Sequence, residues 1–504
     1  MAIRRLNAAL PTALITATVG LPALPAAGQE LVLEEILVTA QRRVESLQRA
    51  PVSVTAFSAD TIEALHIVDV EALTRFAPNV SVNKVPAGAS NATVRIRGIA
   101  NPEVIITTDP KVTLYLDDVL IGKAAGSMLD LIDLQRIEVL RGPQGTLFGR
   151  NTIGGVINVI RTEPTMEWGI DASVTLGSEG REDYKAVVNT PLFSEDWGLK
   201  LFANSINSDG WIYNTTRQED VGGDDYQTYG FAVMGQPTEN LALKLHYEKN
   251  KDKTDVGAWS NFNQPEDLVC QLSAIPGWLW APEQGCEALD EGSDEEHNSM
   301  NGHNPNDTEY DTAIFTVDWD VADIAFTSIT GYREQEEDTL SEYDASSAPF
   351  LYLDFLQEYE QFSQEFRAVT EFGDSVQLLA GLYYWESEYS QDWSTHELYY
   401  ALDLIGAIVP GVPGGAGFTP NTVGYAEQNQ ETTSYAAFGS ADWFISEKWT
   451  MTFGLRYTYE EKDFTGSNSV FYELGDEQPA LAYTDLSDDW SELSPKISAV
   501  SYTH

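Results

Sequence analysis

The sequence is poor in positive charge and in long apolar runs. Its 504 residues carry 29 Lys and Arg side chains against 78 Asp and Glu, which gives a formal net charge of −49. A chain of this charge repels phosphate backbones, so DNA and RNA are excluded as partners. Beyond the N-terminus no run approaches the roughly 18 apolar residues that a membrane helix needs, which excludes a helical membrane protein.

Cysteine is almost absent, and the two present, Cys270 and Cys286, lie within one polar segment. We expect a loop-closing disulfide in an oxidising compartment, because a metal site needs more ligands than two. The surrounding loop from Thr254 to Glu309 contains 12 acidic residues and no Lys or Arg. A solvated, self-repelling loop is the favoured interpretation, and Ca²⁺ binding without EF-hand spacing is the alternative.

The N-terminus indicates a secreted protein. Arg4 and Arg5 precede an apolar region and then small residues up to Gly28, which is typical of a signal peptide over residues 1–28. A retained anchor helix is disfavoured, since prolines interrupt the apolar region. Residues 29–50 are then an extension that contains EEILVTAQRR, an extended segment suited to pairing with the edge of another protein's sheet.

The stretch from Leu134 to Pro164 joins two β-branched runs through a glycine-rich hinge. It is not a phosphate loop, since no Gly-Lys-Ser/Thr ends the run and no GxGxxG opens a helix. Helices are expected to begin at Ser58 or Asp60 and at Asp69. Strands are expected near Val94, Val112, Ile137 and Val156. These elements predict a compact α+β domain over residues 51–164.

From Trp168 onward apolar and polar residues alternate with a period of two. We count roughly 12 strands in residues 165–504. The short links begin at Thr190, Gly235, Asp320, Phe372 and Phe444. The long loops are expected at 208–225, 250–310, 333–358, 387–430 and 461–488. Short links at one end of the strands and long loops at the other indicate an outer-membrane β-barrel, because a soluble sandwich rarely separates its short and long loops so strictly.

Three motifs together resemble the plug domain of TonB-dependent outer-membrane receptors: VRIRGI, DPKVTLYLDDVLIG and LQRIEVLRGPQGTLFGRNTIGGVINVIRTEP. The resemblance covers residues 33–164. It implies an α+β plug domain inside an antiparallel transmembrane β-barrel of about 22 strands, of which roughly 12 are present here. We therefore expect a chain that is truncated in the barrel and unable to insert stably, because an open edge leaves unpaired amides in hydrocarbon.

The resemblance also implies site residues. The TonB box, captured by the energy-transducing partner of the inner membrane, would be Glu35, Ile36, Leu37, Val38, Thr39 and Ala40. The plug motifs would supply Arg95, Arg97, Gly98, Asp109, Tyr115, Asp117, Arg141, Gly142, Pro143, Gly145, Gly149, Asn151, Gly154 and Gly155. The arginines are either solvated or face carboxylates of the barrel wall. Glu365 is expected to face the lumen, either solvated or paired with Arg97 or Arg141.

These parts predict an active importer of the outer membrane, with its signal peptide removed and no cofactor. Its partners would be the TonB protein, outer-membrane lipid and an extracellular small-molecule ligand. The sequences of the plug motifs resemble those of siderophore receptors, which favours a ferric siderophore as the ligand, with cobalamin, haem or an oligosaccharide as alternatives. An adhesin-type receptor without import is a further hypothesis. Deletion of the TonB box would distinguish the two, because import would be lost whereas adhesion would persist. An enzyme is disfavoured, because no arrangement of nucleophile and base stands out.

Overall fold

In the computed structural model the chain has two units, residues 1–35 and 36–504, and the described residues all lie in the second. The described residues are 36–48, 50–65, 67, 69–84, 91–100, 107–123, 132–255, 297–302, 304–343, 345, 351–396, 423–471 and 482–501. Within them, no helix is both long and apolar enough to cross a bilayer.

The elements between Ser53 and Arg161 form a small α+β domain, which we call the plug. Its main sheet has the order β3-β8-β9-β6-β7, in which β6 and β9 are parallel and the other neighbours antiparallel. The strands are β3 (Ser53–Ser58), β6 (Val112–Leu116), β7 (Val119–Ile121), β8 (Leu134–Arg141) and β9 (Gly155–Arg161). The two β-branched runs around the glycine hinge are thus β8 and β9, side by side.

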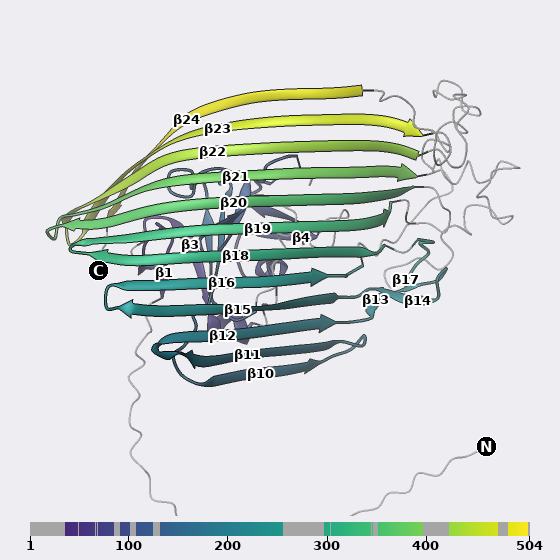
Figure 1. Ribbon diagram of the computed structural model, residues 1–504, viewed down its shortest axis with the longest axis horizontal. Coiled ribbons are helices and arrows are strands. Elements are labelled where there is room, and N and C mark those ends of the chain that lie inside the picture. Colours follow the sequence, from purple (N-terminus) through teal and green to yellow (C-terminus); the bar gives the residue numbers. More distant parts are fainter. Residues whose placement is uncertain are drawn as a thin grey trace, which may run out of the picture. The chain divides into compact units, whose positions relative to one another are not determined.

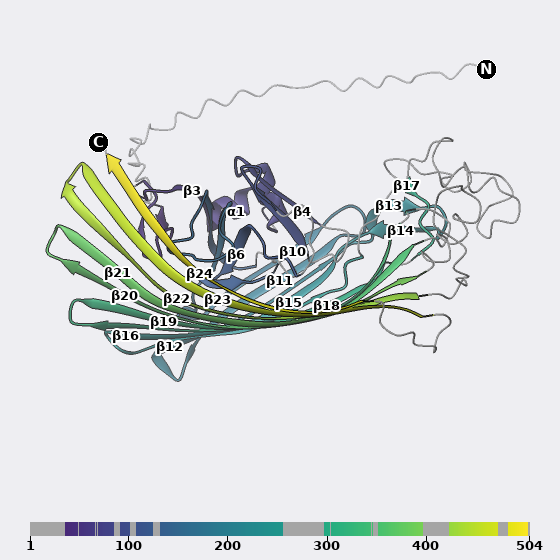
Figure 2. The same ribbon diagram turned by 90° about the horizontal axis from the view of Figure 1, so that it is seen from above.

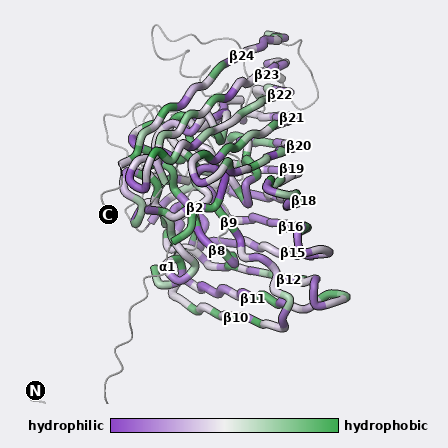
Figure 3. Tube along the Cα trace, turned by 90° about the vertical axis from the view of Figure 1, so that its left-hand side faces the viewer, coloured by the Kyte–Doolittle hydropathy of each residue, from purple (hydrophilic) through white to green (hydrophobic). Residues whose placement is uncertain are grey.

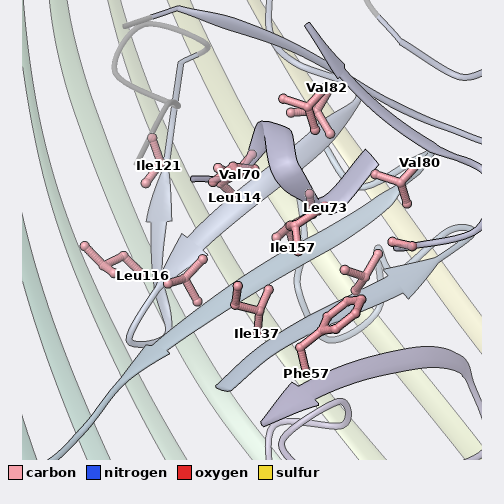
Figure 4. Packing of buried hydrophobic residues seen from close by; sticks show 14 of the residues in the cluster. Phe57, Val70, Leu73, Val80, Val82, Leu114, Leu116, Ile121, Ile137 and Ile157 are labelled. Atoms are coloured by element: carbon pink, nitrogen blue, oxygen red, sulfur yellow. The ribbon is translucent and has the colours of Figure 1, made fainter. Parts of the chain in front are cut away.

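Both predicted helix starts are present in the plug. Ser58 caps α1 (Ala59–Ala64) by accepting a hydrogen bond from the Thr61 amide at 3.4 Å. Asp69 accepts from the Ala72 amide at 2.7 Å at the start of η1 (Glu71–Arg75), which is a short 3₁₀-helix. A second sheet pairs β4 (Val80–Lys84) with β5 (Ala92–Ile96). Figure 4 shows Leu73, Ile137 and Ile157 within the buried core that joins these elements.

The remaining long strands form one twelve-stranded antiparallel sheet, which we call the wall. Each strand pairs with the next in the order β10-β11-β12-β15-β16-β18-β19-β20-β21-β22-β23-β24 (Figure 1). They are β10 (Gly169–Leu176), β11 (Glu182–Leu192), β12 (Ser194–Asn207), β15 (Asp225–Thr238), β16 (Leu241–Asp252), β18 (Asn306–Val321), β19 (Ile324–Glu342), β20 (Tyr352–Phe372), β21 (Val376–His396), β22 (Val423–Ser446), β23 (Trp449–Phe471) and β24 (Ala482–Ser501). The expected number of strands is confirmed. Figure 2 shows the wall as a curved sheet with the plug on its concave side.

The short links are confirmed at all five predicted places, for instance between Val321 and Ile324 and between Phe372 and Val376. Three long loops are shorter than expected, because β19 runs on to Glu342, β21 to His396 and β23 to Phe471. Hydropathy alternates along the wall strands (Figure 3). Residues 333–338 of β19 and 460–463 of β23 are polar on both faces, so the apolar period disappears there although the ladder of backbone hydrogen bonds continues.

Two small sheets complete the described chain. The predicted loop at 208–225 contains β13 (Gly210–Asn214) and β14 (Glu219–Gly222), and β17 (His297–Asn298) joins β13 in parallel. At the N-terminal end of the unit, β1 (Leu37–Val38) pairs with β2 (Glu45–Ser46).

Candidate functional site

The predicted TonB box is folded back onto the plug. Val38 and Ala40 are 0% and 1% exposed, whereas Ile36 and Leu37 keep 41% and 48% of their surface. The Thr39 amide donates to Glu138 Oε1 on β8 at 2.7 Å. The buried alternate residues give this segment a docking site on the plug. Glu35 lies outside the described residues.

Arg42 fastens the end of this segment to both the plug and the wall. Its guanidinium lies 2.9 Å from Asp118 in the β6–β7 turn and 3.9 Å from Glu365 on β20. Arg367 of the wall contacts the same Asp118 at 2.8 Å. We call Arg42, Asp118, Glu365 and Arg367 the Arg42 cluster. It joins three parts of the chain through one buried set of alternating charges.

Aromatic rings enclose the same guanidinium. The carbon centre of Arg42 lies 4.6 Å from the Tyr115 ring and 4.2 Å from the Phe148 ring. Burial alone would raise the pKa of Asp118, but Arg367 and Arg42 outweigh burial and hold that pKa well below its usual range. Asp118 therefore stays ionised, and the cluster persists at every physiological pH.

Arg43 makes a second, separate contact with the wall, an ion pair with the buried Asp442 on β22. It also lies 3.8 Å from Glu45 in β2. Burial raises the pKa of Glu45 to about 7, with Arg43 offsetting part of the effect. Burial likewise raises the pKa of Glu138, in spite of its hydrogen bonds from Arg136 and Thr39. The docked segment thus rests on two carboxyl groups that favour protonation.

Asp109 gathers three cations where the plug meets β23. Arg150 lies 2.7 Å and Lys123 3.4 Å from its carboxylate, and Lys462 of the wall forms a third ion pair. Burial lowers the pKa of Lys123 to about 8, although Asp109 opposes this. Glu460, 3.2 Å from Arg150, brings the five charged groups to a net charge of +1 when all are ionised.

The plug is also fastened at its C-terminal end. Lys200 on β12 lies 2.6 Å from Asp133 and also donates to the Thr162 carbonyl, and it is 1% exposed. Arg161 at the end of β9 pairs with Glu248 on β16, which is fully buried. Buried charges are tolerated only when paired, so these contacts fix where the plug sits.

The hinge residues lie together around the β8–β9 connection. The Gly142 amide donates to the Gly154 carbonyl at 2.9 Å, and the Gly149 amide donates to the Gly145 carbonyl at 3.1 Å. At Gly149, where φ is +84°, a Cβ atom would lie 2.6 Å from Arg456 Nη2 of the wall. Pro143 and Asn151 occupy the same connection, and Gly155 begins β9 directly after it.

Other plug-motif residues make contacts within the plug. Tyr115 donates to the Phe148 carbonyl at 2.6 Å, and Asp117 accepts from the Arg161 amide at 2.9 Å. Gly98 follows β5 with φ +82°. Arg95 is exposed on β5.

Among the described residues, Glu365 is neither solvated nor paired with Arg97 or Arg141, so both alternatives given for it are wrong. Arg97 contacts Ser53 at 3.4 Å, and Arg141 donates to the Pro78 carbonyl and Thr55. Glu365 does face the plug, at 4% exposure, but it lies beside Arg42. Period-two alternation fixes which face of a strand Glu365 occupies, but it carries no information on depth along the lumen.

Sequence reasoning missed Arg42, Arg43, Asp118, Lys123, Arg150 and Lys200. The rarity of cations was the usable signal, since two adjacent arginines directly after an apolar segment are conspicuous in a chain this acidic. The predicted disulfide of Cys270 and Cys286 and most of the acidic loop lie outside the described residues. Among the described residues, no group of three or more His, Cys, Asp or Glu side chains could hold a metal ion.

Two family models match the sequence. Residues 46–156 match the TonB-dependent receptor plug domain, and residues 276–503 match the TonB-dependent receptor-like β-barrel. Among curated proteins, the iron-regulated outer membrane virulence protein of Vibrio cholerae is 28% identical over 227 residues, which are 44% of this chain and 32% of that protein. The vitamin B12 transporter BtuB of Vibrio vulnificus is 28% identical over 182 residues, 35% of this chain and 28% of that protein.

Solved structures share the fold. The ferric yersiniabactin uptake receptor FyuA of Yersinia pestis superposes with a TM-score of 0.68 at 17% identity, covering 89% of this chain and 62% of that one. The chain spans about a third of the length of the curated relatives that it matches.

Proposed function

The chain belongs to the TonB-dependent outer-membrane receptors, a family of transporters and receptors rather than enzymes, and we propose that it imports a ferric siderophore through energy-coupled rearrangement of the plug. The energy would come from contact with the TonB protein, which pulls on the segment that begins at Glu35. The observation that carries this proposal is the Arg42 cluster.

In that cluster the segment, the plug and the wall share one set of charges. Arg42 and Arg367 divide the two oxygens of Asp118, at 2.9 Å and 2.8 Å. Moving the segment outward removes Arg42 from Asp118 and leaves Arg367 as its remaining partner. Displacement of the segment therefore changes the balance of charge between plug and wall, which is what coupling between a pulled tether and a blocked lumen requires.

The choice of a siderophore is supported by the relatives. The Vibrio cholerae protein is named for its regulation by iron, and FyuA takes up ferric yersiniabactin. The second candidate substrate is cobalamin, because the Vibrio vulnificus relative is a vitamin B12 transporter.

The test is growth of a strain that carries the complete gene or its deletion, under iron limitation with defined siderophores and, separately, with cobalamin as the limiting nutrient. We expect growth on at least one ferric siderophore to depend on the gene and to be lost when residues 35–40 are deleted. Cobalamin-dependent growth alone would move the assignment to the second candidate. If the protein without residues 35–40 still binds ligand, and neither it nor the intact protein supports uptake, import is contradicted.

A further inference from the structure

One wall side chain contacts the backbone of the plug at its edge. In the described plug sheet the edge strand β7 is hydrogen-bonded to β6, and its contacts with β19 and Gln361 place its other side against the wall. Gln361 on β20 donates from Nε2 to the Leu120 carbonyl at 2.6 Å, and its Oε1 accepts from the Gly122 amide at 3.0 Å. Both bonds are buried, and Gln361 is 2% exposed.

This pairing matches the chemistry of an exposed strand edge. In an extended strand the carbonyl of one residue and the amide two residues later point to the same side. A primary amide side chain carries one acceptor oxygen and a donor group on neighbouring atoms, so it can satisfy both at once. Gln361 thus takes the place of an additional strand, and it covers an edge that would otherwise be unpaired.

The backbone of β7 and Gly122 fixes the orientation of this amide. If the amide were flipped, its NH₂ group would face the Gly122 amide, which can only donate, and its oxygen would face the Leu120 carbonyl, which can only accept. The oxygen of Gln361 must therefore point toward Gly122, and the nitrogen toward Leu120. Tyr359, two residues earlier on β20, supports this orientation by donating to Gln361 Oε1 at 2.9 Å.

The approach is close along the whole of β7. A Cβ atom on Gly122 would lie 2.9 Å from the Trp385 ring and 3.0 Å from Gln361 Oε1. A Cβ atom on Gly331 of β19 would lie 2.8 Å from Val119 Cγ2. Two glycines, one on each side of the interface, remove the side chains that would keep β7 away from the wall.

We propose that Gln361 is a positioning residue that recognises the backbone of β7, and that this edge of the plug stays attached to the wall while the N-terminal segment is released. The second half rests on the transport function proposed above. It divides the plug into an edge that is held by Gln361 and a tether at Arg42 that moves.

The contact itself is tested by hydrogen exchange of the complete receptor in outer membranes. Gln361→Leu should speed exchange of the Gly122 amide by about tenfold, since a lost hydrogen bond of this kind opens the edge. Gln361→Glu should act in the same direction, because a carboxylate cannot donate to the Leu120 carbonyl. Tyr359→Phe should have a smaller effect.

Gln357→Leu is the matched control, on the same strand and the same face, with Tyr389 at 3.5 Å as its partner. Equal exchange at Gly122 in Gln361→Leu and in this control would overturn the proposal.

The stationary edge is tested with a cross-link. Val119→Cys and Gly331→Cys are combined in a chain whose Cys270 and Cys286 are replaced by Ser, since their close approach suits a disulfide. Ligand uptake by the oxidised pair should remain within about twofold of uptake by the reduced pair. Uptake that stops on oxidation and returns on reduction would overturn the proposal, as would failure of the pair to cross-link. If the receptor without the two introduced cysteines imports none of the ligands, the proposed function is refuted. The hydrogen-exchange experiment still tests whether Gln361 binds the backbone of β7.

Discussion

The two faces of the wall carry their charges in opposite ways. On the plug-facing side several charged side chains meet an opposite charge from the plug, as Arg367 meets Asp118 and Glu248 meets Arg161. On the outer side, carboxylates of six successive strands stand directly opposite one another. This row consists of Asp311, Glu334, Glu360, Glu388, Glu431 and Asp463, and we call it the outer ladder.

Like charges directly opposite each other destabilise a sheet, so such a ladder is tolerable only in water and salt, which screen it. The same outer face is apolar nearer the short links, where Phe366 and Leu382 are 53% and 60% exposed. The inner charges are buried and must be paired, and for that reason they specify the position of the plug. Charged residues on the inner face therefore specify contacts between wall and plug. Charged residues on the outer face instead lie where the apolar surface of the wall ends.

The largest effect is expected from Asp118→Ala, because it leaves Arg42 and Arg367 buried without their shared partner. Local opening of the N-terminal segment should become easier by about 3 kcal/mol. Hydrogen exchange of the Thr39 amide measures this, with Asp60→Ala on the exposed side of α1 as control. Unchanged exchange at Thr39 would show that Asp118 does not hold the segment.

A smaller effect is expected from Lys200→Met, which removes the cation beside Asp133 at the other end of the plug. The loss should be about 1–2 kcal/mol, because Asp133 keeps 17% of its side-chain surface and can be hydrated. Exchange of the Thr162 amide, which donates to the Asp133 carbonyl, is the measurement. An effect at Thr39 as large as at Thr162 would contradict independent fastening of the two ends.

The third prediction concerns pH. Glu45 has a pKa of about 7 when docked against an ordinary value of 4.5, so docking binds a proton. A raised pKa stabilises docking fully below the ordinary value, and the gain is lost as pH rises to about 7. A spin label at Leu37→Cys should therefore be more immobile at pH 5 than at pH 7.5. Glu45→Gln should weaken this dependence, and an unchanged dependence would assign it to Glu138.

The smallest effect is expected on the outer ladder. Glu360→Lys should stabilise the wall by about 0.2–1 kcal/mol, since it turns two repulsive neighbours, Glu334 and Glu388, into attractive ones. Heat denaturation at low and high salt is the measurement, and the gain should shrink in salt. Glu360→Gln separates the loss of repulsion from the gain of attraction. Destabilisation by both variants would mean that the ladder is not simply solvated.

The sequence was sufficient for the strands and for the tight links, because period-two alternation and local turn residues are properties of neighbouring positions. It was insufficient for strand ends such as Glu342 and Phe471, which lie beyond polar stretches at 333–338 and 460–463. Arg42 and Arg367, the partners of Asp118, are 76 and 249 residues away from it, and Leu120 is 241 residues from Gln361. No local pattern records such contacts. Hence Glu365 was placed on the correct face of its strand, but was given the wrong arginines.

The short hairpin of β1 and β2 determines how tension would enter the molecule. Because Leu37 pairs with Ser46 and Val38 with Glu45, a pull applied before Ile36 strains these pairs one after another, not all together. Such a pull would load the two hairpin pairs and the Thr39–Glu138 hydrogen bond before it reaches the ion pairs of Arg42 and Arg43. The resistance of the segment would therefore rise in steps along its length.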